Sequence, residues 1–199
     1  MRIRTPGKLV EPQHRGHADG YDQSVYNHEP ADYDCPFCGL IAGRYNDLSS
    51  PTTLVWCTPT VTAFVSPRMW PTNLGHILVV PNQHHENLYD LPRSLGHAVF
   101  DLSQHIARAI RATYPGCTGT STRQHNEPDG HQDVWHFHQH VFPRYDRDKL
   151  YSSPPRRGYA SIEEQAPYAL RLREYLDESL LGSDGAPTAD EAHRNTEFR

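Results

Sequence analysis

Short apolar runs separated by turn residues predict a series of β-strands in the first two thirds of the chain. Residues 54–57 and 61–65 form two such runs, joined by a short turn. The stretch 75–81 holds four consecutive apolar residues, which indicates a strand buried on both faces. The threonine-rich stretch 118–123 suits a fourth strand because β-branched side chains favour extended backbone.

Three histidines, His136, His138 and His140, occupy every second position of the stretch 133–142. Alternation is the period of a β-strand, so we expect a fifth strand that carries all three imidazoles on one face. Pro143 is expected to end this strand, because proline has no N–H to donate to the ladder.

Helical periodicity replaces alternation between residues 92 and 114. Five apolar residues recur there at spacings of three or four and predict one amphipathic helix. A short helix is expected over 39–42, and a C-terminal helix should run from a capping box at Ser161 to about Leu181. Pro167 fits poorly inside a helix, so we expect a kink or a restart there. The apolar stripe consists of Leu95, Val99, Leu102, Ile106 and Ile110.

This order of elements predicts an α+β fold, with a mostly antiparallel sheet and helices on one side. A chain of 199 residues is expected to form one domain, which we place at 33–181. The flanking stretches 1–32 and 182–199 are polar and lack periodicity, so we expect them to be flexible tails.

Composition narrows the classes of function. The formal net charge of -5 argues against binding to nucleic acid polymers. No apolar run approaches the ~20 residues of a membrane span, and no apolar signal core follows Met1, so we expect a cytoplasmic protein. Cys35 and Cys38 form a CxxC pair, whose spacing in the cytosol favours metal binding or redox use over a disulfide. A pair of reduced core thiols is the plainer alternative.

The alternating histidines allow several interpretations. They could form an ordinary polar strand face. They could bind a metal, because imidazole is the commonest metal ligand and histidine pairs on strands build such sites. They could also act in covalent catalysis, with one imidazole as nucleophile and its neighbours as acid, base and phosphate binder. The local pattern does not choose between metal binding and covalent catalysis.

Four sequence blocks, in order, resemble the histidine-triad (HIT) family of nucleotide hydrolases and transferases. The alternating histidines followed by Pro143-Arg144-Tyr145 resemble its signature, and 126–132 resembles the Asn…Gly-x-Gln segment before it. Residues 75–84 resemble its Gly-His-x-Leu-Val-x-Pro-x-x-His block, and 35–43 resembles the CxxC opening of its zinc-binding members. The resemblance implies a histidine-triad fold, with about five strands, a long helix and a C-terminal helix, and it implies a homodimer.

The same resemblance implies a structural zinc ion. Its ligands would be Cys35, Cys38, His84 and His136, although the neighbouring His85 could replace His84. Four ligands close a tetrahedral zinc site and couple metal binding to folding. If His136 holds metal, the chemistry falls to the second histidine of the triad.

By resemblance, His138 would attack the α-phosphorus of a nucleotide and form a nucleotidyl–histidine intermediate. His140 would contact the α-phosphate, and Asn126 and Gln132 would complete the substrate pocket. A neutral imidazole is a competent nucleophile near neutral pH, and two successive displacements have lower barriers than one.

Two positions depart from the family pattern. Asp133 stands where relatives carry Ser or Thr, and a carboxylate beside a phosphate repels it unless it is protonated or paired with a cation. This substitution favours a cationic leaving group or low activity. Arg68 falls near the position of the ribose-binding Asp or Asn, where it could bind a phosphate or be an ordinary solvated arginine.

The sequence therefore predicts an enzyme that hydrolyses nucleoside phosphoramidates or dinucleoside polyphosphates at the α-phosphate. A nucleotidyltransferase or phosphorylase with the same intermediate is the nearest alternative. A nucleotide-binding protein with a decayed active site is a second alternative, with Asp133 as its sign. A third is a metal-dependent enzyme in which all three triad histidines are ligands.

Overall fold

The computed structural model describes residues 26–181 of the 199-residue chain. The predicted C-terminal tail, 182–199, and most of the predicted N-terminal tail, 1–32, lie outside the described residues. The predicted domain, 33–181, lies within them.

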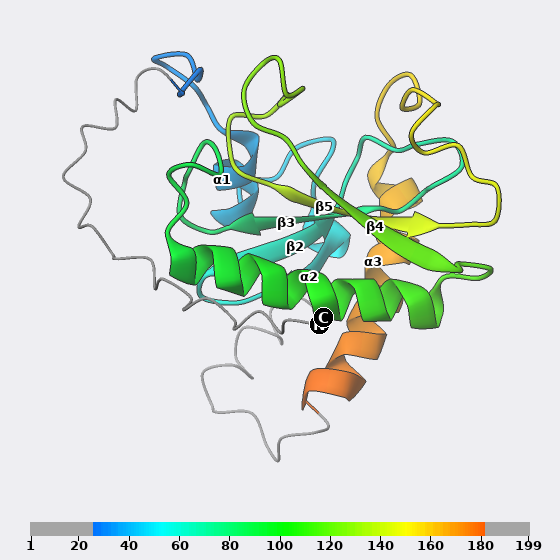
Figure 1. The fold of residues 1–199 in the computed structure, drawn as a ribbon. Helices are drawn as coiled ribbons and strands as arrows, with labels where there is room; N and C mark the ends of the chain where they lie inside the picture. Colours follow the sequence, from blue (N-terminus) through cyan, green and yellow to red (C-terminus); the bar gives the residue numbers. More distant parts are fainter. Residues whose placement is uncertain (1–25, 182–199) are drawn as a thin grey trace, which may run out of the picture.

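Five antiparallel strands form one sheet in the order β1-β2-β3-β5-β4 (Figure 1). Each predicted strand has a counterpart, and the predicted α+β fold is confirmed. The strands are β1 (Leu54–Cys57), β2 (Val61–Val65), β3 (Ile77–Pro81), β4 (Gly119–Gln124) and β5 (Gln139–Arg144).

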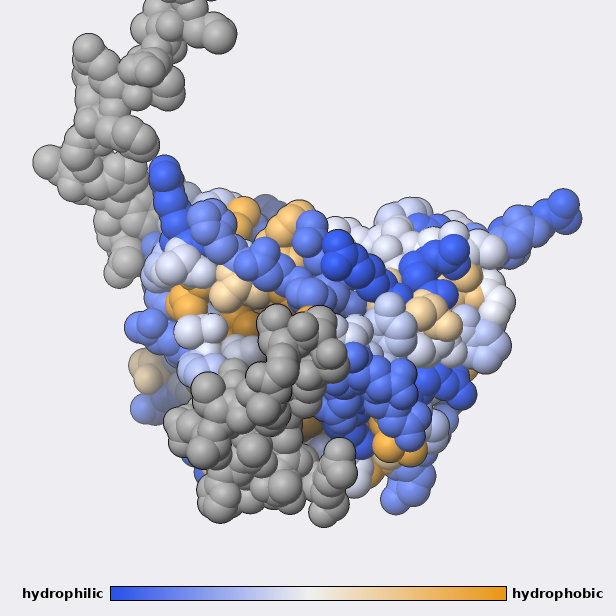
Figure 2. Space-filling view, turned by 90° about the horizontal axis from the view of Figure 1, so that it is seen from below, coloured by the Kyte–Doolittle hydropathy of each residue, from blue (hydrophilic) through white to orange (hydrophobic). Residues whose placement is uncertain are grey.

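Two long helices cover one face of the sheet, and a short helix with several loops lies on the other (Figure 1). Seen from the helical side, the outer surface is mainly hydrophilic, with smaller hydrophobic areas between polar residues (Figure 2). No helix of the described residues is both long and apolar enough to cross a membrane. The helices are α1 (Pro36–Ile41), η2 (Pro51–Thr53), α2 (Arg93–Thr113), α3 (Ile162–Leu176) and the π-helical η3 (Asp177–Leu181).

The helices follow the predictions with two corrections. The short helix begins at Pro36 instead of residue 39, because Cys35 acts as its N-cap and accepts the backbone N–H of Cys38 at 3.4 Å. The C-terminal helix does not restart at Pro167, since α3 continues through it, and the alternative of a kink there stays a prediction. The capping box at Ser161 is present as predicted.

The sheet is buried on both faces at its centre. All five residues of β2 and all five of β3 are buried. Their alternating side chains divide between a large core under α2 and α3 and a smaller core under α1. In the smaller core Phe37 of α1 meets Phe64 of β2 edge to face, with ring centroids 5.3 Å apart. This packing places α1, and its two cysteines, against the strands that carry the histidines.

The fifth strand is shorter at its start than predicted. It begins at Gln139, so His136 and His138 precede the strand and the three histidines do not share one strand face. The reason is that the backbone before Gln139 bonds elsewhere. The N–H of Phe137 donates to the carbonyl of His85 (2.6 Å), and the Pro81 carbonyl at the end of β3 bonds the His136 side chain (3.0 Å).

The prediction that Pro143 ends the strand is also wrong. Pro143 pairs with Thr120 inside the β4–β5 ladder. On the β3 side the ladder stops at Ile77, opposite Val141, and the Pro143 carbonyl accepts the side-chain amide of Asn73 instead (2.8 Å). Proline is tolerated because no backbone acceptor there requires an N–H.

The loop after β5 is held by Asp148, whose side chain is almost fully buried. Its carboxylate bonds Arg144 twice, at 2.7 Å each, and these bonds hold the pKa of the carboxyl well below its usual range. It also accepts the backbone N–H groups of Tyr145 and Leu150 and the amide of Asn73. One carboxylate thus fixes the path of the chain toward Tyr151.

We expect Asp148→Asn to lower the free energy of unfolding by roughly 2–3 kcal/mol. The NH2 group of the new amide is itself a donor, so it could not accept the hydrogen bonds that the carboxylate accepts. Because the carboxyl pKa is depressed in the folded state, its contribution should be complete above about pH 5 and decline as the pH falls through 4. Urea titration of both proteins at pH 7 and pH 4 measures this. The exposed pair Asp146–Arg147 supplies the control: Asp146→Asn should change neither value.

Candidate functional site

Four cysteine and histidine side chains, of the kinds that can bind a metal, converge beside α1. Cys35 and Cys38 lie one helical turn apart, His84 follows β3, and His136 precedes β5. One donor atom from each lies within 4.8 Å of all the others. The structure therefore brings together all four of the predicted ligands.

The spacing of these atoms fits a tetrahedral metal site. The Nδ1 atom of His136 is 3.3 Å from Sγ of Cys35 and 3.6 Å from Sγ of Cys38, and Nδ1 of His84 is 3.3 Å from Sγ of Cys38. Tetrahedral zinc with ordinary bond lengths separates sulfur and nitrogen ligands by about 3.5 Å. The donor set therefore suits such an ion.

The outer nitrogens of both histidines are already bonded. Nε2 of His136 is 3.0 Å from the carbonyl oxygen of Pro81, and Nε2 of His84 is 2.9 Å from the carboxylate of Glu29. Both partners are acceptors, so each Nε2 carries the proton and each Nδ1 turns a lone pair toward the cysteines. Burial lowers the pKa of His136 to about 4, which keeps it in the neutral, ligating form.

Glu29 belongs to an N-terminal strap, residues 26–29, that lies against the turn after β3. The buried carboxylate of Glu86 accepts the backbone N–H groups of His28 (2.6 Å) and Glu29 (3.1 Å), and the Asn87 amide donates to the carbonyl of Tyr26 (3.1 Å). This contact could not be predicted from the sequence, because Glu29 lies in a polar stretch without periodicity. Nothing local marks it, since its partner His84 is 55 positions away.

His138 is prepared to act through one nitrogen. Its Nδ1 lies 2.7 Å from the backbone carbonyl of His136, so that nitrogen carries the proton and Nε2 keeps its lone pair. The side chain is 2% exposed, and Phe37 meets it edge to face at 5.4 Å between centroids. Burial lowers the pKa of His138, so the imidazole is neutral at pH 7.

His140 pairs with a fourth histidine to which the sequence analysis gave no role. Its Nδ1 is 3.3 Å from Nε2 of His76, the histidine of the Gly-His block. Burial lowers the pKa of His76 to about 3 and that of His140 well below its usual value, so both rings are neutral. Nδ1 of His76 has no hydrogen-bond partner among the described residues. The cluster is therefore nearly uncharged, despite its number of titratable rings.

Asp133 and Arg68, both singled out in the sequence, lie next to His138. One carboxylate oxygen of Asp133 is 4.0 Å from Nε2 of His138, and the other is 4.0 Å from Nη1 of Arg68. Arg68 therefore supplies the cation that a carboxylate in this position needs. Both side chains are about half exposed, so their attraction is weak in water.

Asn126 and Gln132 shape the loop before the triad. Oδ1 of Asn126 accepts the N–H of Leu88 (2.8 Å), while the Gln132 amide accepts from the N–H of Glu127 (2.9 Å) and donates to the carbonyl of Glu86 (2.6 Å). Their side chains thus hold the loop, and their contact with a substrate stays a prediction. Between them a Cβ at residue 130 would collide with the Asn126 carbonyl, which explains the glycine there.

Comparison with known proteins agrees with this arrangement. The HIT domain family model matches residues 48–147, half of the chain. Protein hit of Bacillus subtilis is 35% identical over 112 residues, which cover 56% of this chain and 72% of that protein. Adenosine 5'-monophosphoramidase HNT1 of Saccharomyces cerevisiae is 29% identical over 158 residues, covering 78% of this chain and 89% of the yeast protein.

A solved structure shares the fold. A zinc-bound histidine triad family protein from Mycobacterium smegmatis superimposes with a TM-score of 0.61 and 24% identity, covering 76% of this chain and 98% of the other. The sequence match extends through the triad, and the two structures share their fold. The chain accordingly belongs to the HIT, or histidine-triad, domain family.

Proposed function

We propose that the protein hydrolyses nucleotides at the α-phosphate through a nucleotidyl intermediate on His138. The observation that carries the proposal is the hydrogen bond from Nδ1 of His138 to the His136 carbonyl, because it leaves Nε2 as a free nucleophile. A metal-dependent mechanism through all three triad histidines fits less well, because Nε2 of His136 is bonded to Pro81 while its Nδ1 faces the cysteines.

The reaction would proceed in two displacements. Nε2 of His138 bonds to the α-phosphorus as the bond from phosphorus to the leaving group breaks, and the leaving group departs with that electron pair. Water then attacks phosphorus, the P–N bond breaks, and the electron pair returns to Nε2 with release of a nucleoside monophosphate. His140 lies next to His138, with ring centroids 4.9 Å apart, where an imidazole N–H can stabilise the phosphoryl oxygens.

A relative supports this reaction class. The yeast protein that matches 78% of this chain is named as an adenosine 5'-monophosphoramidase, and that name supports an adenosine nucleotide as substrate here. The homodimer that the family resemblance implies stays a prediction.

We further propose that Cys35, Cys38, His84 and His136 hold a structural zinc ion. Zinc would fix α1 and the N-terminal strap to the segment before the triad, and a closed four-ligand site leaves no position for substrate. The zinc-bound relative from Mycobacterium smegmatis and the fit of the donor spacing support this choice of metal.

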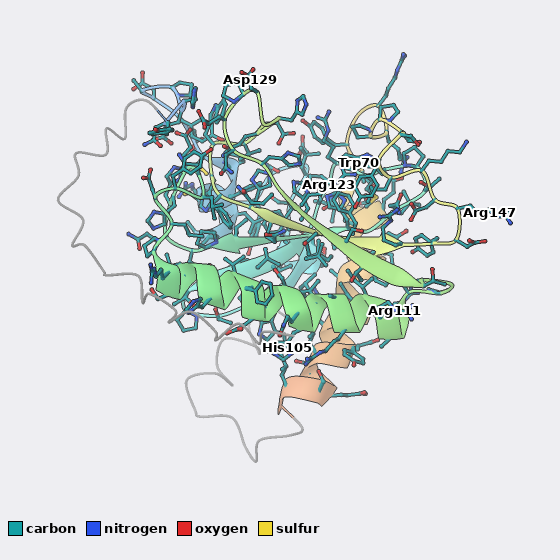
Figure 3. All side chains as sticks on the ribbon, in the orientation of Figure 1. Trp70, His105, Arg111, Arg123, Asp129 and Arg147 are labelled. Atoms are coloured by element: carbon teal, nitrogen blue, oxygen red, sulfur yellow. The ribbon has the colours of Figure 1, made fainter. Side chains whose placement is uncertain are left out.

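Intact mass spectrometry after mixing with adenosine 5'-monophosphoramidate and acid quenching tests the nucleophile. We expect an adduct of one adenylyl group on the wild-type protein and none on His138→Ala, because the variant lacks the attacking nitrogen. Turnover by His138→Ala should fall by at least about 1,000-fold. His105→Ala is the control, since His105 lies on the helical side of the sheet (Figure 3) and its loss should change neither result.

An adduct that persists in His138→Ala would contradict the assignment of the nucleophile. Turnover without an adduct, lost on chelation and restored by metal, would favour the metal-dependent alternative.

Glu29→Ala tests the zinc site through metal affinity. The carboxylate orients His84, so its removal should weaken zinc binding roughly 10–100-fold in competition with a chromogenic chelator. Asp32→Ala removes an equal charge from an exposed residue nearby and should leave the affinity unchanged. An equal loss in both variants would show that net charge, and not the bond to His84, controls affinity.

A further inference from the structure

Arg123 is a charged residue beside the triad to which neither the sequence motifs nor the mechanism above gives a role. It lies on β4, directly opposite His140 in the β4–β5 ladder. Figure 3 shows it close to Trp70, on the side of the sheet away from α2. It therefore shares the face of the sheet on which the histidines lie.

Three aromatic rings hold the Arg123 guanidinium in place. Its central carbon is 4.6 Å from the ring centroid of Tyr151, 5.0 Å from that of Phe142 and 5.7 Å from that of Trp70. Nη2 also donates to the carbonyl of Leu150 at 3.1 Å. Contacts of this kind orient a guanidinium without consuming its charge.

The charge of Arg123 is not neutralised by the protein. Within residues 26–181 no carboxylate oxygen lies within 4.0 Å of its guanidinium. Arg144 differs in this respect. It packs on the same Tyr151 ring (4.8 Å), but both oxygens of Asp148 bind its guanidinium. Arg123 thus remains free to pair with an anion that comes from outside the chain.

A continuous row of rings connects Arg123 to the proposed nucleophile. The Phe142 ring, over which the guanidinium lies, stacks on His76 (4.3 Å) and on His140 (5.5 Å). His140 in turn lies next to His138. The positive charge of Arg123 is one reason for the lowered pKa values of His76 and His140, so the two sites interact electrostatically. Along this row, only the rings of Phe142 and His140 lie between the guanidinium and the ring of His138.

We propose that Arg123, with Trp70 and Tyr151, forms a subsite for a second anionic group of the substrate, namely a phosphate joined to the α-phosphate in an anhydride. This inference rests on the proposed function, and it makes Arg123 the residue that favours polyphosphate substrates over other nucleotides with the same α-phosphate. When Nε2 of His138 bonds to the α-phosphorus, the P–O bond to the leaving phosphate breaks. The leaving oxygen takes the electron pair, and Arg123 stabilises the negative charge that develops on that group.

The test compares two substrates that differ in the leaving group. Attack at the α-phosphorus of diadenosine tetraphosphate expels adenosine triphosphate, a polyphosphate anion. Attack on adenosine 5'-monophosphoramidate expels ammonia, whose nitrogen has taken up a proton. We expect Arg123→Gln to lower kcat/KM about 10–100-fold for the tetraphosphate and less than about threefold for the phosphoramidate. Arg123→Lys should recover part of the loss, because it restores the charge without the planar fork. Arg147→Gln is the control, because Arg147 is an exposed arginine in the loop after β5. Its kcat/KM should be unchanged for both substrates.

Equal losses on both substrates, or no loss on either, would overturn the subsite. Analysis of the products shows whether the bound anion belongs to the leaving group or to an acceptor. If added inorganic phosphate raises wild-type turnover of the phosphoramidate and yields adenosine diphosphate, the subsite binds an acceptor. The assignment to the leaving group would then be wrong. If thermal unfolding shows that Arg123→Gln does not fold, Arg123→Lys replaces it in the comparison. The expected result is then a lower kcat/KM for the tetraphosphate alone.

A binding measurement separates this proposal from the proposed function. Calorimetry with inorganic tripolyphosphate needs no turnover. Binding by the wild-type protein that is lost in Arg123→Gln and kept in Arg147→Gln would support the subsite even if no adenylyl adduct forms. Absence of tripolyphosphate binding by a protein that does form the adduct would overturn the subsite and leave the proposed function standing.

Discussion

The imidazole of His136 is the group on which the rest of this site depends. Its Nε2 bonds the end of β3, its Nδ1 faces Cys35 and Cys38 at the start of α1, and its backbone carbonyl accepts a hydrogen bond from Nδ1–H of His138. One residue therefore joins the central sheet, the first helix and the proposed nucleophile. The ring of His136 thus belongs to the candidate metal site, while its backbone carbonyl sets the tautomer of the neighbouring His138.

The electrostatic design places neutral rings at the centre and full charges at the edge. Burial keeps His76, His138 and His140 unprotonated, which preserves lone pairs and N–H donors in a region of low dielectric constant. Arg68 and Asp133 lie on one flank and Arg123 lies on another. An anionic substrate would thus meet its counter-charges at the rim and weakly charged donors at the reacting phosphorus.

Much of the fold follows from local sequence pattern. The strands at 54–57 and 61–65 and the long helix were predicted almost to the residue, because their apolar periodicity agrees with the layer each one packs against. The strand at the triad is shorter than predicted, although its sequence alternates perfectly, because the backbone before Gln139 does not join the ladder. Its backbone bonds to the turn after β3, which is some 50 residues earlier in the chain. The family resemblance named the four predicted metal ligands, which the structure brings together. Glu29 and Arg123 contact partners distant in sequence and carry no local signal.

The N-terminal strap has a consequence for how this protein can change. Glu86 holds the strap through the main-chain N–H groups of residues 28 and 29, which every amino acid except proline provides. Side chains at these positions can therefore be exchanged while the strap stays docked. Position 29 can therefore vary without loss of the backbone contacts. A single substitution there would change the basicity of His84, a predicted metal ligand, and leave the four predicted ligands, the sheet and the triad unaltered.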